Sequence, residues 1–184
     1  LAKEADNLDA NSYCELILGL PGETRESHFN TLEATINAGF NKVIPYQLMV
    51  LQGSEMGSTE TIEKFGMDIR SRVLPRAFGA YRFLGATIKS ADIENVCVAS
   101  NTLSYEEYLE CRQMHLIVTI FYNDVIFETV LKALRTQGLS VFRWLELISD
   151  TTIESKVEGL FDDFRKHTGS ELWKSRTDLE AFIQ

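Results

Sequence analysis

The sequence predicts an α/β fold in which a strand–helix–strand unit is followed by a mainly helical region. The first observation is an apolar stretch, Tyr13–Leu18, that glycine and proline residues end at once, as they do where a strand enters a sharp turn. The second is the helical spacing of apolar residues at 25–38, followed by a strand-like stretch at 42–51 that is rich in Val, Ile and Leu. The third is the helical spacing that dominates after residue 104.

The helix between the two predicted strands has clear ends. Thr24 is a good N-cap, Glu26 places an acidic group in the first turn, and Gly39 ends the helix. A crossover of this length fits a helix and not a hairpin, so the two strands are predicted to be adjacent and parallel. Ligands of such units gather at the carboxyl ends of the strands, here residues 19–23 and 47–54. The alternative is that the Gly-Leu-Pro-Gly turn is only a tight connection.

The rest of the chain divides into a connector at 57–92 and a mainly helical domain at 93–184. The connector holds four arginines among aromatic residues, which either bind an anionic group or pair with nearby carboxylates: Arg70, Arg72, Arg76 and Arg82. A short strand is predicted at 93–99, and Ser104 caps a long helix that is expected to run to Thr136. Three further helices are expected at 139–148, 152–167 and 170–183.

The composition argues against several functions. There are 27 acidic and 18 basic residues, and the net charge of -9 disfavours binding to nucleic acid or to an anionic membrane surface. No stretch is long and apolar enough to predict a membrane span. The chain lacks a phosphate-binding Gly-Lys-Ser/Thr loop and a Gly-x-Gly-x-x-Gly turn. Its three cysteines and three histidines lack metal-site spacing, so no metal ligand is assigned: Cys14, Cys97, Cys111, His28, His115 and His167. Cysteines without paired spacing suggest reduced thiols and a cytoplasmic protein.

One part of the sequence resembles a known family. Glu-Leu-Ile-Leu-Gly-Leu-Pro-Gly-Glu-Thr at 15–24, then Ser-His-Phe-Asn-Thr-Leu, and a strand ending Tyr-Gln-Leu-Met-Val-Leu-Gln-Gly-Ser-Glu-Met, resemble the later strands of the radical S-adenosylmethionine (radical SAM) barrel. The resemblance covers residues 1–56 and implies the fifth strand, its helix and the sixth strand of a partial TIM-type barrel. Within the family the chain looks most like the group with a cobalamin-binding domain, which includes relatives of the anaerobic oxidative cyclase of magnesium-protoporphyrin IX monomethyl ester.

The resemblance also implies cofactor-binding residues. Glu15, Ile17 and Gly19 share one face of the first strand by period-two alternation. The resemblance places Ile17 against the adenine of S-adenosylmethionine, with close approach at Gly19 and Glu15 projecting into the barrel. Main-chain groups of Gln47 and Leu48 would contact the adenine. The chain departs from the family's usual pattern, which has glycine at position 15 and an acidic residue three after Gly19.

The function that the resemblance implies is that of the C-terminal portion of a radical SAM enzyme. Such an enzyme cleaves S-adenosylmethionine reductively at a 4Fe-4S cluster and directs the radical at a small-molecule substrate, with cobalamin as a further cofactor in the related group. The cluster motif Cys-x-x-x-Cys-x-x-Cys is absent, so the upstream part of the same chain is expected to hold it and this portion to be inactive alone. No catalytic residue is assigned. The alternative is a non-catalytic helical module for binding or assembly.

Overall fold

The computed structural model describes residues 11–123, 125–150 and 155–183. The predicted strand–helix–strand unit is present as β1 (Tyr13–Leu18), α2 (Arg25–Asn37) and β2 (Lys42–Gln47). The two strands are parallel neighbours, in register from the Tyr13–Lys42 pair to the Leu18–Gln47 pair, which confirms the predicted pairing. Thr24 caps α2 through a capping box with Ser27. The fold is therefore a mixture of helices and strands, as predicted.

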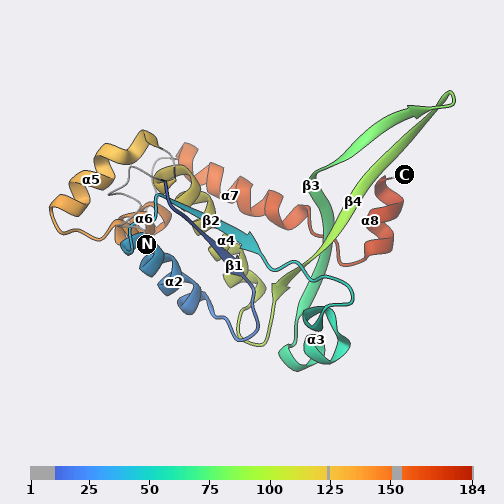
Figure 1. The fold of residues 1–184 in the computed structure, drawn as a ribbon, viewed down its shortest axis with the longest axis horizontal. Coiled ribbons are helices and arrows are strands. Elements are labelled where there is room, and N and C mark those ends of the chain that lie inside the picture. Colours follow the sequence, from blue (N-terminus) through green and yellow to red (C-terminus); the bar gives the residue numbers. More distant parts are fainter. Residues whose placement is uncertain (1–10, 124, 151–154, 184) are drawn as a thin grey trace.

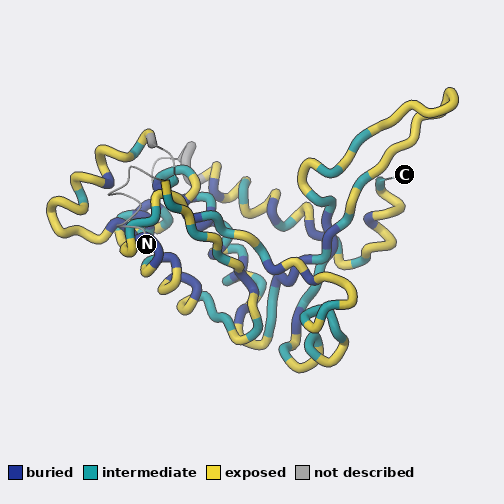
Figure 2. Tube along the Cα trace, viewed as in Figure 1, coloured by how far each residue is buried: buried dark blue, intermediate teal, exposed yellow. Residues whose placement is uncertain are grey.

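Residues 57–92, which the sequence predicts to be a connector, are largely regular structure. The helix α3 (Thr59–Phe65) is followed by a long antiparallel hairpin of β3 (Asp68–Phe83) and β4 (Ala86–Ala99), and the outer part of this hairpin projects away from the other elements (Figure 1). Leu84 and Gly85 form its two-residue turn with φ of 48° and 81°, as a hairpin turn requires. The strand predicted at 93–99 is only the base of β4. The outer hairpin shows no alternation of apolar and polar residues because most of its residues are exposed on both faces (Figure 2).

The base of the hairpin joins the end of the parallel sheet. Cys97 N–H donates to the carbonyl of Leu48 at 3.0 Å, and Val50 N–H donates to the carbonyl of Asn95 at 2.8 Å. On the other side, Ser71 exchanges two backbone hydrogen bonds with Trp173. These bonds place the hairpin base beside the carboxyl ends of β1 and β2.

The prediction of one long helix from Ser104 to Thr136 is wrong, because the helix is interrupted near Asn123. It forms α4 (Tyr105–Ile117), a π-helical turn η2 (Val118–Tyr122), a 3-10 turn η3 (Val125–Phe127) and α5 (Glu128–Thr136). The side chain of Asn123 accepts from Val43 N–H at 2.8 Å and donates to Val43 C=O at 2.6 Å, so it is held against β2. Three helices follow as expected: α6 (Val141–Asp150), α7 (Ser155–Ser170) and α8 (Arg176–Ile183). Residues 152–154 of the expected helix lie outside the described residues.

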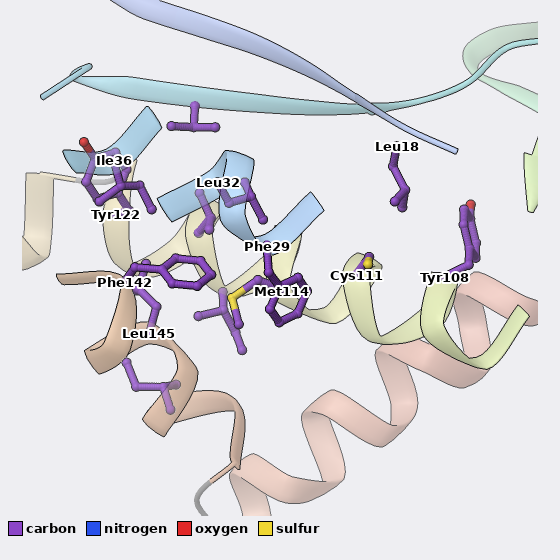
Figure 3. Packing of buried hydrophobic residues seen from close by; sticks show 14 of the residues in the cluster. Leu18, Phe29, Leu32, Ile36, Tyr108, Cys111, Met114, Tyr122, Phe142 and Leu145 are labelled. Carbon is purple, nitrogen blue, oxygen red and sulfur yellow. The ribbon is translucent and has the colours of Figure 1, made fainter. Parts of the chain in front are cut away.

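The main hydrophobic core lies on one side of the parallel sheet. Leu18 points from the sheet toward α2, α4 and α6, where Leu32, Met114 and Leu145 are each at most 1% exposed (Figure 3). Val43 on β2 belongs to the same buried cluster. The opposite face of the sheet is open, with an aromatic and aliphatic surface of Tyr13, Ile17 and Tyr46. The described residues contain one strand–helix–strand unit and do not form a barrel. No helix among them has the length and apolar character to cross a membrane.

Candidate functional site

The candidate site is the open face of the parallel sheet together with the turn that follows β1. Glu15 and Ile17 lie on the open face, paired in register with Ile44 and Tyr46, while Leu18 is buried on the helix side. The predicted alternation along β1 is therefore present. Ile17 is 44% exposed and Tyr46 is 48% exposed, so the two side chains offer an apolar surface to a ligand or to another layer of protein.

Gly19 is required by its packing against β4. Its φ of +96° lies in the region that favours glycine, and a Cβ atom there would be 3.2 Å from the carbonyl oxygen of Cys97 and 3.7 Å from the Cβ of Leu48. The space beside Gly19, which the resemblance reserves for the cofactor, is thus occupied by the backbone of β4. A close approach to Gly19 does occur, but the approaching group is part of the protein.

Gln47 and Leu48 already have partners within the protein. The side-chain oxygen of Gln47 accepts from Arg72 Nη2 at 2.9 Å. Leu48 N–H donates to the carbonyl of Leu18 at 2.8 Å, and Leu48 C=O accepts from Cys97. The backbone N–H of Leu48 is therefore not free to contact an adenine, and the Leu48 carbonyl oxygen, which accepts from Cys97 N–H, has only its second lone pair left for such a contact.

Glu23 organises the turn after β1. Its Oε2 atom accepts from the backbone N–H of Gly19 at 2.6 Å and from that of Leu20 at 3.3 Å, and its Oε1 atom lies 2.8 Å from Nδ1 of His28. The Gly-Leu-Pro-Gly-Glu sequence is thus a closed structural unit in which the acidic residue fixes the glycine amide. Glu23, which lies four residues after Gly19 and not three as in the family's usual pattern, therefore has a structural role in this turn.

A buried pair of histidines extends this network to α4. Nε2 of His28 lies 2.7 Å from Nε2 of His115, and the two residues are 1% and 2% exposed. Because His28 Nδ1–H donates to the Glu23 carboxylate, its Nε2 accepts from His115 Nε2–H when both rings are neutral. Burial first, and then the charges of His28 and Arg112, hold the pKa of His115 well below its ordinary value. The sequence does not predict this pair, because 87 positions separate the two histidines.

The arginines of β3 pair with acidic residues. Arg72 is buried and donates to Glu94 at 2.6 Å, to Glu171 at 2.8 Å and to Gln47. Burial lowers the pKa of Arg72, but the two carboxylates outweigh burial, so its pKa is raised. Arg70 pairs with Asp68 at 3.0 Å. For these two arginines the carboxylate-pairing alternative is the one observed.

The cysteines do not fit an iron–sulfur cluster. Cys97 and Cys111 are buried on different elements, and burial raises their pKa values to about 11 and about 12, while Cys14 lies half-buried on β1. Across the described ranges, no group of three or more His, Cys, Asp or Glu side chains is placed to hold a metal ion.

Comparisons with known proteins add no family to these observations. No family model matches the chain, and no curated protein shows a significant match to it.

Proposed function

We propose that this chain is the last part of a radical SAM barrel, in which β1 and β2 are the fifth and sixth strands. The observation that carries the proposal is the open face of the parallel sheet. Parallel sheets are normally covered on both faces, yet here Tyr13, Ile17 and Tyr46 are exposed opposite the helices. In a barrel this face would be the interior wall, which is the surface that the resemblance assigns to S-adenosylmethionine.

The edges of the sheet support the same arrangement. Asn123 occupies both backbone groups of Val43 on the outer edge of β2, and Pro45 on the same edge has no N–H to donate. Among the strands that the structure describes, only β2 pairs with β1. Further strands would therefore add beside β1, which is where the earlier strands of the barrel would lie.

In the proposed enzyme these residues shape the cofactor wall. Ile17 would contact the adenine, Glu15 would accept hydrogen bonds from amino or hydroxyl groups, and Gly19 with Glu23 would hold the turn that ends the wall. The cysteines present do not fit the 4Fe-4S cluster, so the upstream part of the chain would supply its ligands. No residue of this portion is assigned to cobalamin or to the substrate.

The first test uses a longer polypeptide, which consists of residues 1–184 and the sequence encoded upstream of them in the same gene. We expect a Cys-x-x-x-Cys-x-x-Cys motif there, and we expect the anaerobically reconstituted protein to release 5′-deoxyadenosine from S-adenosylmethionine when a reductant is added. The chain of residues 1–184 alone should bind no stoichiometric iron. An upstream sequence without the three cysteines would refute the proposal, as would a brown, iron-loaded fragment.

A substitution tests the cofactor wall in the same reconstituted protein. Ile17→Asp should weaken S-adenosylmethionine binding about tenfold or more, equivalent to about 1.4 kcal/mol, because it places a charge against the adenine. Leu139→Asp is the matched control, since Leu139 is 58% exposed and lies outside the sheet. Equal affinities in two folded variants would discard the assignment of Ile17.

The alternative is a non-catalytic assembly module, and the end of the hairpin favours it. Phe78, Phe83 and Leu84 are 70%, 64% and 91% exposed, which is unusual for large apolar side chains that have no partner. This alternative would be supported by an upstream sequence without cluster cysteines, together with a stable complex between this chain and another subunit that Leu84→Ser abolishes.

A further inference from the structure

A cavity of about 260 Å³ lies under β2, between this strand, α4 and α7. Its described lining combines an apolar wall with a few polar groups: Lys42, Val43, Ile44, Pro45, Arg112, His115, Leu116, Thr119, Asn123 and Phe164. The ionisable residues in this lining are all basic or imidazole groups, although the chain as a whole carries a net charge of -9. The cavity therefore has the opposite electrostatic character to the rest of the protein.

Arg112 brings an unpaired positive charge to this cavity. Its Nε atom is buried without a hydrogen-bond partner, and Arg112 forms no ion pair with any residue that the structure describes. Burial lowers the pKa of Arg112, yet a guanidinium remains charged in proteins. Arg112 is partly buried, its guanidinium lies 5.8 Å from the Phe164 ring centre, and the charge of Glu171 acts on it without a direct contact. An anion bound directly to Arg112 would supply the hydrogen-bonded counter-ion that it lacks among the described residues.

His115 brings a second unsatisfied atom from the same face of α4, one turn further along. Its Nε2 atom is committed to His28, while its Nδ1 atom is buried and has no partner. In the neutral ring described above, Nδ1 carries a lone pair and accepts a hydrogen bond. The cavity thus offers a charged donor and a neutral acceptor from positions i and i+3 of one helix.

We propose that this cavity binds a small hydroxy acid with an apolar body. The carboxylate accepts hydrogen bonds from Arg112, the hydroxyl group donates to Nδ1 of His115, and the apolar body packs against Leu116 and Phe164. Inorganic phosphate fits less well, because it has no apolar body to pack against Leu116 and Phe164 and because one guanidinium does not neutralise a dianion. The proposal rests on the cavity alone and is independent of the radical SAM assignment.

Calorimetric titration of the chain with 3-phenyllactate tests the proposal. Two matched probes separate the contacts, since 3-phenylpropionate lacks the hydroxyl group and 3-phenylpropane-1,2-diol lacks the carboxylate. We expect each to bind about tenfold more weakly than 3-phenyllactate or worse. Arg112→Gln should weaken 3-phenyllactate binding by a similar factor, whereas Arg143→Gln should not, because Arg143 is exposed and pairs with Glu146 on α6.

Two further measurements keep the test decisive if Arg112→Gln does not fold. In the unaltered chain, 3-phenyllactate should shift the nitrogen resonances of Arg112 Nε and His115 Nδ1 and leave that of Arg143 Nε unchanged. Arg112→Met should melt at the same temperature as the parent chain or higher, because it removes a partly buried charge that has no salt-bridge partner among the described residues. Absence of binding at about 10 mM, tighter binding of inorganic phosphate, or equal binding of the three organic probes would overturn the proposal.

Discussion

Replacement of Arg72 by methionine should be among the most destabilising single changes in the chain. The substitution removes the guanidinium and leaves the Glu94 carboxylate, whose side chain is only 7% exposed, without its partner at 2.6 Å. Breaking a buried ion pair in this way costs about 3–5 kcal/mol. Glu171 adds at most about 1 kcal/mol, because its side chain is 44% exposed and water screens its interaction with Arg72. The expected loss of unfolding free energy is therefore about 3–5 kcal/mol.

A double-mutant cycle separates the ion pair from the packing of the methylene groups. Glu94→Met should cost about 1–3 kcal/mol, since Arg72 keeps Glu171 and Gln47 as acceptors. Arg72→Met combined with Glu94→Met should recover most of the stability, because neither charge is then left buried alone. Urea denaturation followed by circular dichroism measures all four proteins. A loss below about 1 kcal/mol for Arg72→Met, or no recovery in the double variant, would contradict this account of the cluster.

Three further predictions concern other residues of the network and the core. Because burial holds the pKa of His115 below its ordinary value of 6.5, the folded chain binds fewer protons than the unfolded chain, so the free energy of unfolding should fall as the pH drops below about 6.5. Urea midpoints measured from about pH 7.5 to about pH 5 should show this slope, and an unchanged slope in His115→Gln would contradict it. Iodoacetamide should label Cys14 first in the native chain, since burial raises the pKa values of Cys97 and Cys111 to about 11 and about 12; equal labelling found by mass spectrometry would be inconsistent with the fold. Asn123→Ala should cost about 1–3 kcal/mol and promote association, because it leaves two backbone groups unpaired on the β2 edge; urea denaturation and light scattering measure these effects, and a monomer of unchanged stability would count against this edge protection.

Local features of the sequence were sufficient to predict the strand–helix–strand unit. The cap at Thr24, the stop at Gly39 and the length of the crossover all lie within the unit, and they determine its helix and the parallel pairing. The interruption of the helix near Asn123 depends on Val43, which lies 80 positions away in the sequence. The apolar residues around Asn123 keep helical spacing, so the sequence predicts an uninterrupted helix there. The outer hairpin was missed for a different reason, because strands exposed on both faces carry no period-two pattern.

The candidate site was predicted less completely than the fold. The open face with Glu15 and Ile17 follows from alternation along one strand, and that part of the prediction is present in the structure. The hydrogen bond between His28 and His115, and the crowding of Gly19 by Cys97, arise between elements that only tertiary packing brings together. No spacing rule in a single sequence reports such contacts.

The close contact between Gly19 and Cys97 gives the projecting hairpin a mechanical consequence. The portion of β4 from Cys97 to Ala86 spans about 36 Å at about 3.3 Å per residue, so a tilt of about 10° at its base would displace the tip by about 6 Å. Because the hairpin is long and its contact with Gly19 lies at the base, a small movement at the base corresponds to a large movement of the tip. A load applied at the exposed tip is passed to the base, where β4 contacts Gly19 and is hydrogen-bonded to Leu48 and Val50.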